Sequence, residues 1–110
     1  MESGAKCRAT KRIDPLNLRE FENLERIVDA LASKTRLAIL AILLNYGEAC
    51  TCDLTSALNV AQPTVTIHLQ KLYDAGLIEK RESWRYTYYS ISKKYAPLIK
   101  TILKLKASPK

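Results

Sequence analysis

The chain has 110 residues, a length typical of one compact domain and too short for two. Its 47% hydrophobic and 26% charged residues argue against a disordered chain, and its longest apolar run, Leu37 to Leu44, is far too short to span a membrane. The net charge of +7 favours a polyanionic partner such as nucleic acid, and without a signal-peptide pattern we expect a cytoplasmic protein with no membrane partner.

The N-terminal segment differs in composition from the rest of the chain. Residues 1–13 are polar and carry four basic side chains, which predicts a flexible arm. Asp14 followed by Pro15 predicts the start of a helix, because Asp caps a helix N-terminus and Pro suits the first turn. We therefore expect the domain to span residues 14–106, with a short C-terminal tail over 107–110.

Four helices are predicted before residue 76. The first carries apolar residues at helical spacing, namely Leu18, Phe21, Leu24, Ile27, Val28 and Leu31. The second begins after Ser33, which can cap it, and ends at Gly47. Its apolar face carries Leu37, Leu40, Ala41 and Leu44. A short third helix over 52–58 and a fourth over 62–74 are joined by a three-residue link, the arrangement of a helix-turn-helix.

The periodicity then changes from helical to alternating. Segments 78–82 and 86–91 predict two strands joined by a turn over 83–85. By alternation, the second strand directs Tyr89 and Ile91 to one face and Tyr86, Tyr88 and Ser90 to the other. A last helix is expected from about 95 to 106. The predicted fold class is mainly α with a β-hairpin wing, a winged helix-turn-helix.

The fourth helix has one apolar and one uncharged polar side. Val65, Leu69 and Leu72 are expected to pack on the domain, which leaves the other side free to contact base edges in a DNA major groove. The predicted DNA-contacting residues are Gln62, Pro63, Thr64, Thr66, Ile67, Gln70 and Lys71 on this helix, with Arg81, Trp84 and Arg85 near the hairpin tip. The alternative is a solvated helix face followed by an ordinary charged turn.

Two further polar residues belong to the predicted second and fourth helices. Arg36, like Lys71, is expected to bind phosphates, whereas His68 lies at the edge of the packed side and is expected to be structural rather than a ligand. With one histidine and no second catalytic group, the sequence disfavours an enzyme such as a small thiol oxidoreductase. Binding of RNA or of nucleic acid in general is the other alternative.

The three cysteines suggest a thiol site. Side chains two positions apart in a regular helix diverge, so Cys50 and Cys52 converge only if Cys50 lies in an extended lead-in and Cys52 in the first helical turn. A helix N-terminus favours thiolates, which bind soft ions. Cys7, on the arm of the same or the other subunit, is a candidate third ligand. The alternatives are thiol oxidation and two cysteines that only pack in the core.

Together these residues resemble the arsenic-repressor (ArsR/SmtB) family of prokaryotic sensors over about residues 17–106. The resemblance is carried by DALASKTRL from Asp29, CTCDL from Cys50, QPTVTIHL from Gln62, AGLI from Ala75 and YYS from Tyr88. It implies a repressor that forms a homodimer through its first and last helices, binds a double-stranded DNA operator and is released by an inducer. The apolar faces of those two helices, which one small domain cannot fully bury, independently favour a dimer.

The resemblance also implies the inducer. Relatives with this cysteine pair respond to arsenite or antimonite, or to cadmium, lead or zinc, and need no cofactor. This chain has Thr55 where the arsenite type has its third cysteine, and it has a single arm cysteine, Cys7, where the cadmium/lead type has two. A trigonal site of Cys7, Cys50 and Cys52 would suit As(III) or Pb(II) better than Zn(II). The last helix lacks the Asp and His ligands of the family's zinc site.

Overall fold

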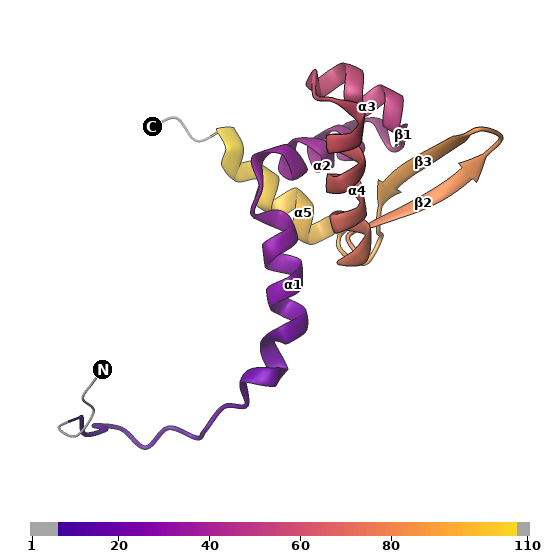
Figure 1. Cartoon of the computed structure of the whole chain (residues 1–110). Helices are drawn as coiled ribbons and strands as arrows, with labels where there is room; N and C mark the ends of the chain where they lie inside the picture. The colour runs from indigo at the N-terminus through magenta and orange to yellow at the C-terminus, as the bar shows by residue number, and fades with distance from the viewer. Residues whose placement is uncertain (1–6, 108–110) are drawn as a thin grey trace.

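A computed structural model describes residues 7–107, and the predictions for residues 1–6 and 108–110 lie outside this range. The elements in chain order are a 3-10 turn (Leu18–Phe21), α1 (Glu22–Leu31), α2 (Lys34–Tyr46), β1 (Ala49–Cys50), α3 (Thr51–Leu58), α4 (Gln62–Asp74), β2 (Ile78–Ser83), β3 (Tyr86–Ile91), α5 (Ala96–Leu103) and a second 3-10 turn (Lys104–Ala107). Figure 1 shows the β2–β3 hairpin projecting from a helical body and the N-terminal segment stretching away from it. The predicted winged helix-turn-helix is confirmed.

The helix-turn-helix unit forms where the sequence predicts it. Asn59 ends α3 in the left-handed conformation, with φ of 55°, which Asn tolerates better than most residues. Pro63 lies in the first turn of α4, where its missing N–H costs no hydrogen bond. The predicted bounds of α4 are confirmed, and its side chains Val65, Leu69 and Leu72 are buried in the core as expected.

The predicted helix start at Asp14 and Pro15 is wrong. Residues 14–17 are neither helix nor strand, and the first turn begins at Leu18, where the Asn17 side chain accepts a hydrogen bond from the Arg19 N–H at 3.0 Å. The apolar side chains here, including Leu18, are largely exposed. A helical turn without burial is only marginally stable, so a capping signal alone does not extend α1.

The buried face of α2 also differs from the prediction. Ile39, Leu40 and Leu43 are buried, whereas Leu37 and the other predicted positions, Ala41 and Leu44, are only partly covered. This helix is apolar on nearly every side, so the sequence does not single out one face. Leu37 and Ala41 instead line an apolar groove between α2 and α5.

The sheet contains a strand, β1, that the sequence did not predict. The sheet order is β1-β3-β2, with Ala49 opposite Tyr89 and Cys50 opposite Tyr88. β2 runs one residue further than expected, to Ser83, so the turn is Trp84–Arg85 alone. Tyr89 and Ile91, which were predicted to share one face of this strand, both pack against the core. We call the β2–β3 hairpin, residues 78–91, the wing.

The two ends of the folded chain leave apolar side chains uncovered. On α1 and the turn before it these are Leu18, Phe21, Leu24 and Val28, and at the C-terminal end they are Leu98 and Leu105. The last helix was predicted to reach residue 106; its α-helical part ends at Leu103 and continues as a 3-10 turn.

Within residues 7–107, none of the helices has the length and apolar character needed to cross a bilayer.

Candidate nucleic-acid interface and thiol site

The outward side of α4 is uncovered by the part of the chain that the structure describes. All seven residues predicted there to contact DNA are exposed, namely Gln62, Pro63, Thr64, Thr66, Ile67, Gln70 and Lys71. The apolar Ile67 is 69% exposed. Gln70 donates a hydrogen bond to the Asp74 carboxylate at 2.8 Å. The face therefore has the uncharged donors, acceptors and methyl groups that base edges require.

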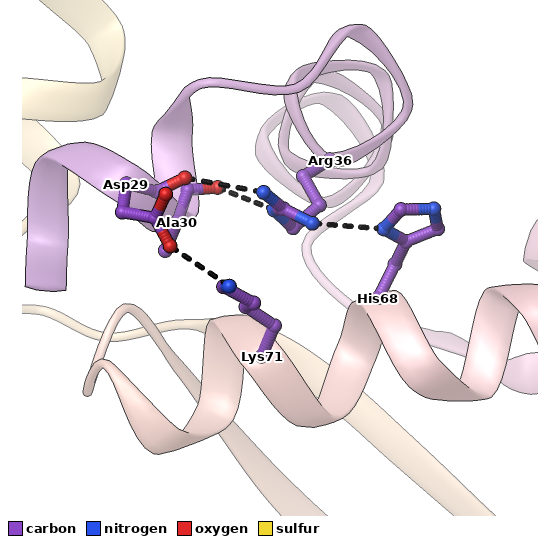
Figure 2. A network of polar contacts seen from close by, with 5 residues as sticks. All are labelled: Asp29, Ala30, Arg36, His68 and Lys71. Carbon is purple, nitrogen blue, oxygen red and sulfur yellow. Dashed lines mark hydrogen bonds and ion pairs between the residues drawn. The ribbon is translucent and has the colours of Figure 1, made fainter.

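Arg36 has a structural role that the sequence did not predict. Its guanidinium donates to the carbonyls of Ala30 (2.7 Å) and Asp29 (3.1 Å), near the C-terminal end of α1. Its Nη1 lies 3.1 Å from Nδ1 of His68 on α4. Figure 2 shows this network, in which Arg36 connects the end of α1 to the inner edge of α4. Arg36 is thus occupied by protein acceptors rather than free for phosphates.

The same network contains an ion pair from α4 to α1. Lys71 Nζ lies 2.8 Å from the Asp29 carboxylate, and this hydrogen bond and charge lower the pKa of Asp29. Partial burial, and then the positive charge of Arg36, lower the pKa of His68. A neutral His68 accepts a hydrogen bond from Arg36 at Nδ1, which fits the structural role expected for this histidine. We call Asp29, Ala30, Arg36, His68 and Lys71 the α1–α4 network.

A second ion pair holds the wing. Arg81 donates to both carboxylate oxygens of Glu48, from Nη2 at 2.8 Å and from Nε at 3.1 Å, and its guanidinium lies over the Tyr88 ring. The hydrogen bond and charge lower the pKa of Glu48 and raise that of Arg81. Arg81 therefore joins the wing to the loop before β1, while Trp84 and Arg85 at the tip are exposed.

The cysteine pair has the arrangement that convergence requires. Cys50 is the N-cap of α3 with extended backbone angles (φ −90°, ψ 171°), and Cys52 lies in the first helical turn. The Asp53 carboxylate accepts from the Cys50 N–H at 3.0 Å, which fixes this helix start. Cys50 is buried and Cys52 is exposed. Because Cys50 belongs to both β1 and the start of α3, it lies between the wing and the helix-turn-helix.

Both cysteines line one hollow of about 270 Å³. Its walls come from three elements: residues 50–52 at the start of α3, Gln62 at the start of α4, and residues 85–87 with Tyr89 in the wing. A group bound to the two sulfurs would thus adjoin both parts of the predicted DNA-binding surface. We call this space the cysteine hollow.

The described residues supply two thiols there, not three. Within residues 7–107, no cluster of three or more His, Cys, Asp or Glu side chains is arranged to hold a metal ion. Cys7 is exposed on the N-terminal segment, which Figure 1 shows leading away from α3. Thr55, at the position of the third cysteine in the arsenite type, donates a hydrogen bond from its hydroxyl to the Thr51 carbonyl at 2.9 Å. Two thiols could bind a soft ion, but the described part of one chain does not supply a third ligand for that ion.

Sequence reasoning missed three contributors to these sites. Asp29, Glu48 and strand β1 act through partners distant in the sequence: Lys71, Arg81 and β3. No sequence pattern pairs either carboxylate with its cation, and a two-residue strand has no measurable periodicity. Only the folded chain brings these groups together.

Comparison with known proteins gives consistent results. The family model described as bacterial regulatory protein, arsR family, matches residues 33–80, which span α2 to the first residues of β2. The chain is 40% identical over 62 residues to the arsenical resistance operon repressor of Escherichia coli (strain K12), a match covering 56% of this chain and 53% of that protein. It is 37% identical over 75 residues to the arsenical resistance operon repressor of Bacillus subtilis (strain 168), covering 68% and 69%.

A solved structure supports the fold. The homodimeric winged helix-turn-helix DNA-binding domain of a possible regulator from Mycobacterium bovis matches with a TM-score of 0.74 at 24% identity, covering 90% of this chain and 94% of that one. This likeness extends the similarity beyond the segment matched by the family model, to nearly all of the described residues.

Proposed function

Because the chain belongs to the arsR family of bacterial regulatory proteins, which are DNA-binding transcriptional regulators and not enzymes, we propose that it is a repressor released from its operator by a thiophilic ion at Cys50 and Cys52. One observation carries the proposal: the two cysteines share the cysteine hollow with Gln62 and the wing. An ion bound there would contact the elements that hold DNA.

Binding to DNA rests on α4 and the wing. Gln62 and Thr66 supply hydrogen-bonding groups for base edges and Ile67 a methyl-sized apolar contact, with Pro63, Thr64 and Gln70 beside them. Lys71, Arg81 and Arg85 contribute positive charge toward phosphates, although Lys71 and Arg81 also hold intramolecular ion pairs. Trp84 completes the proposed surface at the tip of the wing.

A homodimer would place two such surfaces on one duplex. The uncovered apolar side chains of α1 and of the α5 end are the surfaces proposed to meet across a two-fold axis. Two α4 helices about one DNA turn apart, roughly 34 Å, would then contact a palindromic operator.

The inducer follows from the chemistry of the pair. Two thiolates favour soft ions, so As(III), Sb(III), Cd(II) and Pb(II) are the proposed ligands, and the names of the two arsenical relatives favour As(III). Cys7 of the partner subunit is the proposed third ligand, since the N-terminal segment leads away from its own α3. No resident cofactor is needed for this function.

Two contacts could transmit the binding event. α3 packs on α4, with its Leu54 buried in the core, and β1 carries Cys50 into the sheet that continues as the wing. A shift of the α3 start would therefore move the helix-turn-helix and the wing relative to each other. Couplings of this kind are typically about 1–3 kcal/mol, or roughly 5- to 150-fold in affinity.

The test measures DNA affinity against inducer. A high-affinity duplex is first selected in vitro with the reduced full chain, and its binding is followed as arsenite, Cd(II) or Pb(II) is added. Release should accompany sulfur-to-metal absorption in the ultraviolet, and Cys50→Ser and Cys52→Ser should abolish both. Cys7→Ser tests the third ligand separately: it should weaken the response, and an unchanged response would remove Cys7 from the site. Induction that survives both serine variants at the pair would overturn the sensing mechanism.

The same variants address the alternatives. A thiol-redox regulator would respond to the disulfide-forming oxidant diamide rather than to metalloids, again through Cys50 and Cys52. An effector-independent regulator would respond to neither. Affinity that falls with salt but ignores sequence would indicate general nucleic-acid binding instead.

A further inference from the structure

The tip of the wing holds a tryptophan in a conformation that lowers the stability of the isolated chain. Trp84 has a φ of 63°, in the left-handed region that disfavours a bulky side chain. Of the two turn residues only Trp84 has this conformation, and two-residue hairpin turns with positive φ at that position usually place Gly there. A Trp at this position therefore strains the turn.

The indole is also unprotected. Trp84 is 93% exposed, and within residues 7–107 no aromatic or cationic side chain stacks on its ring. It is the only tryptophan in the chain. Exposing so large an apolar surface on a projecting tip is typical of a residue that contacts a partner.

The position of the wing indicates which partner. Gln62, the first residue of α4, and wing residues 85–87 line the same cysteine hollow, so the wing flanks the N-terminal end of α4. With α4 in a major groove, the wing lies over the adjacent backbone and minor groove. Arg85 beside Trp84 supplies positive charge toward that polyanion.

We propose that Trp84 is a minor-groove anchor, whose indole enters the groove next to the α4 site while Arg85 contacts the flanking phosphates. This inference rests on the proposed DNA-binding function and adds a contact made by apolar surface rather than by hydrogen bonds. Apolar side chains in the minor groove open flexible base steps, so Trp84 would favour an A·T-rich flank that contains a flexible TA step on each side of the operator.

The single tryptophan makes the test direct. With the selected duplex and the reduced full chain, Trp84 emission should shift to the blue and lose its quenching by acrylamide. Prior binding of netropsin to the flanking minor groove should prevent this change. An unchanged spectrum with tight, sequence-specific binding would refute the anchor alone, whereas absence of sequence-specific binding would refute the proposed function. A blue shift that depends on protein concentration without DNA would assign Trp84 to a protein contact and overturn the proposal.

Substitutions provide a second readout. Trp84→Gly should raise the Tm, because it relieves the strained turn, yet weaken operator binding about tenfold, the scale of one lost aromatic–base contact. Trp84→Phe should retain most of the affinity. Tyr46→Ala removes another exposed aromatic side chain that lies outside the wing and should change neither quantity. A Trp84→Gly variant that binds as tightly as the parent would refute the proposal.

Discussion

The fourth helix and the wing are held to the body in different ways. α4 is fixed by Val65, Leu69 and Leu72, all buried, and by the α1–α4 network on its inner edge. The wing packs on the core only at its base, through Ile78, Tyr89 and Ile91, and beyond the base it is fixed by the short β1–β3 ladder and by the exposed Glu48–Arg81 pair. One element is anchored to the core along its length, whereas the outer part of the other is held by polar contacts.

This difference separates two tasks. Base recognition requires side chains held in a fixed place, which the core provides for α4. Release by the proposed inducer requires an element that moves at low energetic cost, and we propose that the outer part of the wing, joined to Cys50 through β1, has this role. The comparison predicts that perturbing the packed side of α4 lowers stability, whereas perturbing the Glu48–Arg81 pair of the wing changes coupling.

The largest effect is expected in the packed side of α4. Leu69→Ala should lower the free energy of unfolding by about 2–5 kcal/mol, because it leaves a cavity in a closed core. Ile67→Ala, two residues earlier on the exposed side, should change it by less than about 0.5 kcal/mol while weakening operator binding. Urea denaturation and DNA titration measure the two quantities, and equal stability of the two variants would contradict the assignment of faces.

A smaller loss is expected in the α1–α4 network. Arg36→Met retains the aliphatic stem but removes the hydrogen bonds to Ala30, Asp29 and His68, which should cost about 1–3 kcal/mol of stability. Since the network joins α4 to the helix proposed to dimerise, the variant should also tolerate altered spacing between operator half-sites. Affinity measured on duplexes with one base pair inserted or removed tests this. An unaltered spacing preference would show that α4 is positioned by packing alone.

The same comparison shows what the sequence could predict. The bounds of α4, its buried face and the sides of β3 follow from periodicity, because local burial determines them. The face of α2 does not, since this helix is apolar nearly all round. The contacts that Arg36 and Arg81 make within the chain could not be predicted. Their acceptors lie on Asp29 and Glu48, which no local pattern places beside them.

The wing pair should affect coupling more than stability. Glu48→Gln removes the charge that holds Arg81, and because both side chains are exposed we expect no measurable change in Tm. The released wing should follow the cysteine segment less closely, so the ratio of operator affinities without and with arsenite should fall. Glu79→Gln, on an exposed β2 position outside this pair, is the matched control. An unchanged ratio in Glu48→Gln would assign the coupling to α3 and α4.

The smallest effect should appear on changing pH, and it should involve only the α4 side. His68 accepts from Arg36 as a neutral ring, and its pKa in the folded state lies below the usual 6.5, through partial burial and then the Arg36 charge. The unfolded chain therefore takes up the proton first, so the stability present above pH 6.5 is lost as pH falls from there through the folded pKa. His68→Gln, whose amide oxygen can still accept a hydrogen bond from Arg36, should not show this loss of stability between pH 7.5 and 5.5 in urea denaturation.

The Glu48–Arg81 pair should be unaffected in that pH window, because a carboxyl with a lowered pKa protonates only at much lower pH. A parent protein as stable at pH 5.5 as at pH 7.5 would mean that the Arg36–His68 contact does not contribute to anchoring α4.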